Sequence, residues 1–139
     1  MAKITKDVLD GLHTLSFEPG YLEKLEELAE ELRECEDAHL AVEPVLRFIE
    51  EHPDEDLGAP GPLVHFVEEF YSRGYEKLLL ESVTRRATPL NVWMLNRLIN
   101  GAEGAEQEEY LTVLKRIASD ERSAPDVQAL ALEFLSHED

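Results

Sequence analysis

The chain has 139 residues, of which 43% are hydrophobic, and this length and composition are typical of a single globular domain. It carries 31 acidic and 13 basic residues, which give a formal net charge of −18 at pH 7. Because such a field repels polyanions and attracts cations, we expect a basic protein partner, and neither nucleic acid nor an anionic membrane.

Cysteine content and hydropathy bear on the compartment. The chain has one cysteine, Cys35, which excludes an internal disulfide and fits a reducing environment. No stretch approaches the roughly 20 apolar residues needed to span a bilayer. The first residues lack the apolar core and cleavage site of a secretory signal. We therefore expect a cytoplasmic protein.

The acidic residues are concentrated in the first half of the chain. Residues 1–60 contain 17 acids and 5 bases, a net charge of −12, whereas residues 61–139 contain 14 acids and 8 bases, a net charge of −6. Two interpretations stay open, namely a binding surface for a basic partner and a face that only keeps the protein soluble.

The first 35 residues predict two helices. Ile4, Val8 and Leu12 recur every four residues and indicate a short helix that ends near Leu15. An amphipathic helix follows, with an apolar stripe formed by Tyr21, Leu25, Leu28, Leu32 and Cys35. Its opposite face has glutamates at the same spacing and is predicted to be strongly negative: Glu23, Glu27, Glu30 and Glu34.

A third helix and a long loop come next. Residues 37–51 have a helical pattern, but Pro44 cannot lie in a helix interior without loss of a hydrogen bond, so we expect a start or a kink there. Residues 52–62 contain three prolines and two glycines and predict a loop. This loop presents Asp54, Glu55 and Asp56 together.

The second half predicts helices in pairs. We expect a helix between Pro62 and Gly74, and another from Tyr75 to the basic pair Arg85–Arg86, where the helix dipole favours cations. After a turn at residues 101–107, a helix is built around Tyr110, Leu114 and Ile117. The last helix starts near Pro125 and is predicted to bury Val127, Leu130, Ala131, Phe134 and Leu135.

Residues 88–101, TPLNVWMLNRLING, form the most apolar segment, and the other helices are expected to pack around it. Thr88 suits the N-cap, and Gly101 suits a left-handed stop. Trp93 is expected in the core, or alternatively, if it is exposed, as an aromatic anchor for a partner. Asn96 and Asn100 lie one turn apart, so we expect a buried polar network there, or alternatively a binding surface.

No segment alternates apolar and polar residues as a strand would. The sequence therefore predicts an all-α single domain over residues 1–139 with about eight short helices. The helices form either stacked hairpins, as in a HEAT-like solenoid, or an irregular bundle. Residues 124–135, APDVQALALEFL, resemble the second helix of a HEAT-type repeat.

Common catalytic and metal-binding patterns are missing. Glu36 and His39 form one Glu-x-x-His unit, whereas carboxylate-bridged di-iron sites need two. His65 and Glu69 lie one turn apart, which is more typical of a hydrogen-bonded histidine at the edge of a core. The chain has no phosphate-binding glycine loop, no GxSxG and no CxxC. We expect no enzyme, no metal and no cofactor.

Two segments, GPLVHFVEEFY (61–71) and TPLNVWMLNRLIN (88–100), resemble small immunity proteins of bacterial polymorphic-toxin systems, of the Rhs and contact-dependent-inhibition kind. The resemblance implies an inhibitor that binds tightly to one cognate toxin domain made by the same cell. The sequence leaves the oligomeric state open and favours a monomer. Charge and pattern then give the expected partner-binding residues: Glu27, Glu30, Glu34, Asp54, Glu55, Asp56, Tyr71 and Asn96. Two alternatives are a HEAT-like adaptor for another basic protein and an enzyme with an unfamiliar site.

Overall fold

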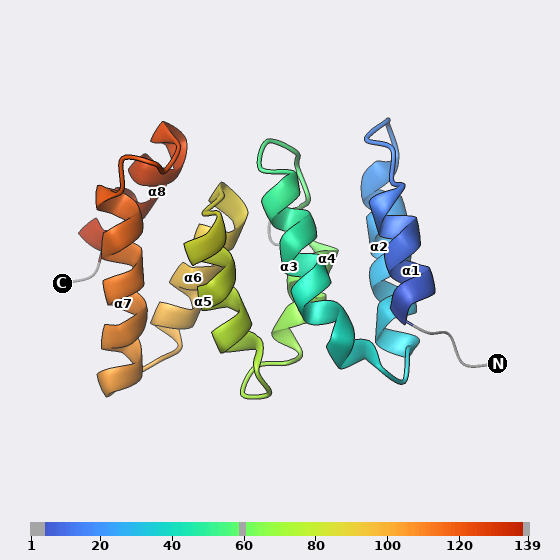
Figure 1. Cartoon of the computed structure of the whole chain (residues 1–139), viewed down its shortest axis with the longest axis horizontal. Helices are drawn as coiled ribbons and strands as arrows, with labels where there is room; N and C mark the ends of the chain where they lie inside the picture. Colours follow the sequence, from blue (N-terminus) through green and yellow to red (C-terminus); the bar gives the residue numbers. More distant parts are fainter. Residues whose placement is uncertain (1–4, 59–60, 138–139) are drawn as a thin grey trace. The chain divides into compact units, whose positions relative to one another are not determined.

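The computed structural model describes residues 5–58 and 61–137. Over these residues the chain is all-helical and has no strand, which confirms the predicted fold class. The helix packing is consistent with a stack of hairpins or with a bundle. The elements shown in Figure 1 are α1 (Thr5–His13), α2 (Tyr21–Glu34), η1 (Ala38–Ala41), α3 (Val42–Glu51), α4 (Pro62–Glu68), α5 (Tyr75–Arg85), α6 (Pro89–Asn100), α7 (Gly104–Ser119) and α8 (Pro125–Ser136).

The chain divides into two compact units. Unit 1 consists of Met1–Phe48 and Asp54–Tyr75, and unit 2 consists of Ile49–Pro53 and Glu76–Asp139. The division passes through α3, whose last turn belongs to unit 2. The single domain expected from the sequence stays a prediction.

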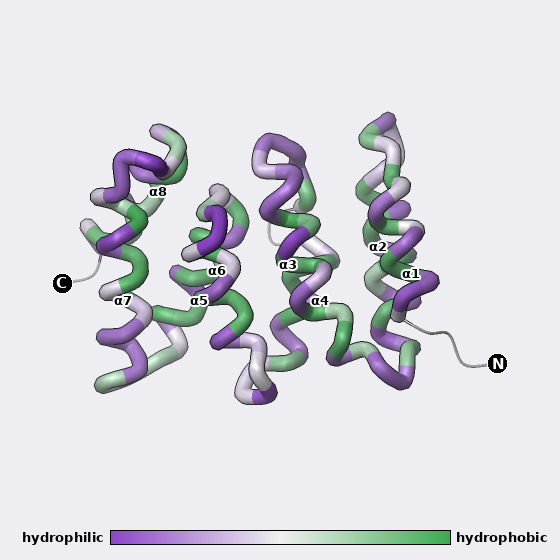
Figure 2. The backbone as a smooth tube through the Cα atoms, in the orientation of Figure 1, coloured by the Kyte–Doolittle hydropathy of each residue, from purple (hydrophilic) through white to green (hydrophobic). Residues whose placement is uncertain are grey.

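In unit 1, α1 and α2 pack against each other as a hairpin, and α2 also packs against α4. The predicted stripe is buried at Val8, Leu12, Leu25, Leu28 and Leu32, while Ile4 lies outside the described residues. Figure 2 shows hydrophobic and hydrophilic residues alternating along these helices, as amphipathic packing requires. The Thr5 hydroxyl donates to the Asp37 carboxylate at 2.7 Å and so ties the start of α1 to the segment after α2.

The predicted boundaries around Pro44 are confirmed in part. The 3₁₀ helix η1 occupies the beginning of the predicted segment, and α3 starts at Val42, two residues before Pro44. A proline in the first turn removes no helical hydrogen bond, because the amides there have no partner within the helix. The predicted loop is confirmed for residues 52–58 and for Gly61.

The helix predicted between Pro62 and Gly74 ends earlier, at Glu68. Phe70 is buried and contacts the Phe66 ring edge-on, with 5.5 Å between centroids. Ser72 then takes a left-handed conformation with φ of 64°, which an α-helix of L-residues cannot accommodate. The chain therefore turns at residues 69–74.

In unit 2, α6 is buried at Val92, Met94, Leu95, Leu98 and Ile99, as predicted. The expectation that the other helices pack around it is wrong, because α6 packs mainly against α7 and α8, whereas α2 packs against α1 and α4 within unit 1. Thr88 caps the helix: its hydroxyl accepts from the Asn91 amide at 3.2 Å, and its own amide donates to Asn91 Oδ1 at 2.7 Å.

The predicted left-handed stop at Gly101 is wrong. Gly101 has φ of −96°, and its amide donates to the carbonyls of Arg97 and Leu98. The backbone turns left-handed only at Gly104, with φ of 62°, where α7 begins inside the predicted turn.

The last helix, α8, is less buried than predicted. Val127 and Ala131 are buried, whereas Leu130, Phe134 and Leu135 are half-buried. Leu132 is 58% exposed. None of the described helices is both long enough and apolar enough to cross a membrane.

Candidate functional site

The acidic face of α2 is exposed. The helix buries Leu25, Leu28, Ala29 and Leu32, which leaves the glutamates at the predicted spacing on the outside, including Glu27, Glu30 and Glu34. Lys24 lies 3.7 Å from Glu27, and both side chains are largely exposed. Because exposed ion pairs are weak and the acids outnumber the bases, the face stays strongly negative.

Arg33 connects this face to the turn after α4. Its Nη1 lies 2.5 Å from Glu30 Oε1, and its Nε donates to the Glu69 carboxylate. The Glu69 hydrogen bond, together with the nearby negative charges, raises the pKa of the Arg33 guanidinium. Glu69 is the C-cap of α4, and Tyr71, two residues later, is 47% exposed. The Arg33–Glu69 ion pair therefore links α2 to the turn after α4. These two elements carry four of the predicted site residues: Glu27, Glu30, Glu34 and Tyr71.

The acidic loop, residues 54–56, is tied to the other end of α2. Its three side chains are exposed. The Tyr21 hydroxyl donates to the Asp56 carbonyl at 2.6 Å, and the Gly58 amide donates to Asp56 Oδ1 at 2.9 Å. Tyr21 is the first residue of α2, so the acidic loop lies at the start of this helix, whereas Glu27, Glu30 and Glu34 lie along it.

Asn96 belongs to unit 2 and is half-buried on α6. Asn100 is exposed, so the expected buried network of Asn96 and Asn100 is wrong. Trp93, expected in the core, is half-buried, and the Arg97 guanidinium lies 5.1 Å from the centre of its ring. Asn91 is the fully buried asparagine of this helix.

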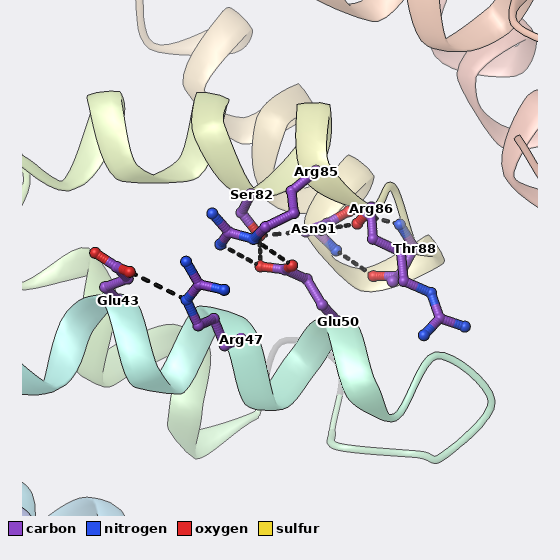
Figure 3. A network of polar contacts seen from close by, with 8 residues as sticks. All are labelled: Glu43, Arg47, Glu50, Ser82, Arg85, Arg86, Thr88 and Asn91. Atoms are coloured by element: carbon purple, nitrogen blue, oxygen red, sulfur yellow. Dashed lines mark hydrogen bonds and ion pairs between the residues drawn. The ribbon is translucent and has the colours of Figure 1, made fainter. Parts of the chain in front are cut away.

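Unit 2 contains a buried polar network that the sequence analysis missed (Figure 3). Glu50 is only 6% exposed. Its Oε1 accepts from Arg85 Nε at 2.7 Å, and its Oε2 accepts from Arg85 Nη2 at 2.6 Å and from Ser82 Oγ at 2.7 Å. Asn91 Nδ2 extends the network to Ser82 Oγ at 3.3 Å and to the Arg86 carbonyl at 2.9 Å.

This network joins the last turn of α3 to α5 and to the start of α6. Both oxygens of the Glu50 carboxylate accept hydrogen bonds, so the arrangement is suited to holding helices together. One sequence signal could have identified it, because Glu50 lies four residues after Leu46 and eight after Val42, on the apolar stripe of its helix.

Two histidines, His39 and His65, belong to the metal and acid–base patterns that the sequence offered. His39 and His65 are exposed, and Glu69, the expected neighbour of His65, binds Arg33. Within residues 5–58 and 61–137, no group of three or more His, Cys, Asp or Glu side chains is placed to hold a metal ion.

Comparison of the chain with protein-family models, with curated proteins and with solved structures gives no match. The resemblance to immunity proteins therefore stays a prediction.

Proposed function

We propose that this protein is an immunity protein that binds the basic substrate-binding surface of a cognate toxin and thereby neutralises it. The observation that carries the proposal is the exposed acidic face of α2, which Arg33 links to the turn that presents Tyr71. The acidic loop adds three carboxylates at the other end of the same helix.

Charge supports this kind of partner. Unit 1 contains 17 acids and 6 bases, a net charge of −11, and unit 2 contains 14 acids and 7 bases, a net charge of −7. Complementary charge speeds diffusional encounter and disfavours acidic competitors. Toxins that act on nucleic acids must attract a polyanion, so their clefts are basic, and an acidic protein can occupy such a cleft.

Tyr71 supports a protein partner. An exposed tyrosine brings a large apolar area with only two side-chain torsions to be ordered, and tyrosine is enriched among the residues that dominate binding energy. Its ring can also stack on a lysine or arginine of the partner. A binding mode of this kind combines acidic residues at the rim with an aromatic anchor.

The test uses tagged protein in the source cell and two charge-reversed variants. The loop variant is D54K/E55K/D56K, and the helix variant is E27K/E30K/E34K. A matched control, E108K/E109K/E121K, changes exposed acids of unit 2 and has the same net charge, −12. Wild type and control should capture one basic protein that is toxic alone and harmless in the complex, and they should protect cells equally.

The loop and helix variants should capture less of this protein and protect less well, because each loses carboxylates at the proposed interface. If the loop, helix and control variants all protect cells as well as wild type does, the acidic face of α2 and the acidic loop are not the binding surface. Capture of several non-toxic proteins instead of one toxin would favour the HEAT-like adaptor.

A further inference from the structure

Tyr21 connects a cluster of aromatic rings to the acidic loop. Its ring contacts Phe17 edge-on, with 5.1 Å between centroids, and Phe17 stacks on Phe48 at 6.3 Å. Its hydroxyl donates to the Asp56 carbonyl at 2.6 Å. All of these residues belong to unit 1. The loop is thereby hydrogen-bonded to the first residue of α2, whose ring belongs to this aromatic cluster.

The hydrogen bond from Tyr21 leaves the carboxylates of the loop available. It is accepted by a main-chain oxygen, and the Asp54 and Glu55 side chains are exposed. On the far side of Asp56, Leu57 is buried, and the Gly58 amide donates to Asp56 Oδ1 at 2.9 Å. The loop is therefore held at Asp56 and at Leu57, while the side chains of Asp54, Glu55 and Asp56 are exposed.

Three adjacent carboxylates repel one another, so an unsupported loop would sample many arrangements of charge. Fixing the loop before binding reduces the ordering cost that binding would otherwise carry. Desolvation, and then the carboxylates of Asp56 and Glu55, raise the pKa of the Tyr21 phenol above 10.0.

We propose that Tyr21 is a positioning residue that holds the acidic loop, residues 54–56, in the conformation in which it meets basic side chains of the partner. This inference rests on the proposed function, in which the loop is part of the binding surface. Tyr21 itself need not touch the partner.

The first test is made on the free protein. Tyr21→Phe keeps the ring contacts and the charge and removes only the hydroxyl. Amide hydrogen exchange at Gly58 should become about 2- to 10-fold faster, which is the typical effect of losing one hydrogen bond. Exchange in the interior of α2 should not change, and neither should exchange at Gly58 in Tyr71→Phe. Unchanged exchange at Gly58 in Tyr21→Phe would overturn the positioning role.

The second test measures binding to dodecalysine at low salt, read locally from the NMR shifts of the amides of residues 54–58. Tyr21→Phe should raise the dissociation constant measured at these amides about 2- to 10-fold, which means weaker binding. In the D54K/E55K/D56K background the same substitution should have no effect, because the charges that Tyr21 positions have been removed. Equal weakening in both backgrounds would mean a general defect of the fold and would overturn the inference.

The outcomes separate the two proposals. If D54K/E55K/D56K binds dodecalysine at the loop and protects cells as wild type does, the loop is not a binding surface and its proposed function is wrong. If that variant is impaired but Tyr21→Phe is not, the loop's function stands and the positioning role of Tyr21 is wrong.

Discussion

Glu50 is a buried carboxylate that accepts three hydrogen bonds, two of them from one guanidinium. Glu50→Ala should lower the free energy of unfolding by about 1.5–3 kcal/mol, the usual range for hydrogen bonds to charged groups. The loss should stay below that for a fully buried ion pair, because the Arg85 side chain is 31% exposed and water can reach it. Urea denaturation measures the difference.

The same helix offers a matched control. Glu43 pairs with Arg47 at 3.0 Å, but these two side chains are 47% and 51% exposed. Glu43→Ala removes the same charge and should cost only about 0–1 kcal/mol. Equal losses for the two variants would show that burial of the Glu50 network does not contribute to stability.

Asp37 gives the stability a dependence on acid pH. The hydroxyl of Thr5, followed by the Thr5 amide, donates to its carboxylate and lowers its pKa below 3.8. A carboxyl group whose pKa is depressed in the folded state stabilises the protein above its unfolded-state pKa, and this contribution disappears as the pH falls through the folded-state value.

Thr5→Val should therefore destabilise the protein most at neutral pH, and the difference from wild type should shrink below about pH 3.8. Urea denaturation at a series of pH values measures this difference. In an Asp37→Asn background the effect of Thr5→Val should no longer depend on pH. If Thr5→Val and wild type, both with Asp37 intact, differ in free energy of unfolding by the same amount at every pH, the ionised carboxylate is not the partner of Thr5.

At the scale of elements, α6 is the most buried helix of unit 2 by pattern and by structure. Leu95 and Ile99 are completely buried. Leu95→Ala or Ile99→Ala should lower the free energy of unfolding by about 2–5 kcal/mol, through lost burial and the cavity left behind. Denaturant titration provides the measurement. Leu132→Ala, at a site 58% exposed, is the control and should cost no more than about 0.5 kcal/mol.

The sequence predicted helices where apolar residues recur with the helical period. The stripes of α2 and α6 and the loop after α3 could be predicted because each depends on residues close together in the chain. The early end of α4 could not, since it follows from Phe70 packing on Phe66 and from the left-handed backbone of Ser72. No local pattern marks a serine for that conformation.

At the candidate surface too, features within one helix could be predicted from the sequence, whereas contacts between residues far apart in the sequence could not. Exposure of Glu27, Glu30 and Glu34 follows from the pattern of one helix. The Arg33–Glu69 pair and the Tyr21–Asp56 hydrogen bond join residues 36 and 35 positions apart, and the pattern of a single helix cannot predict such pairs. The partners of Glu50 could not be predicted either, because Ser82 and Arg85 lie on another helix.

At the scale of the whole molecule, the net charge of −18 has two consequences of opposite sign. Repulsion between like charges destabilises a compact chain, whereas attraction to a basic partner speeds association. Salt screens both, with a Debye length of about 8 Å at physiological ionic strength. The same addition of salt should thus stabilise the free protein and slow its binding.

The expected result is a melting temperature that rises with NaCl, measured by circular dichroism, and an association rate with the captured basic partner that falls, measured by stopped flow. The helix variant E27K/E30K/E34K and the control E108K/E109K/E121K share a net charge of −12, so the salt dependence of melting should be shallower in both. At low salt the helix variant should associate more slowly than the control, because only the helix variant changes the face of α2. If the two variants associate equally slowly, net charge alone governs encounter and the acidic face has no special role.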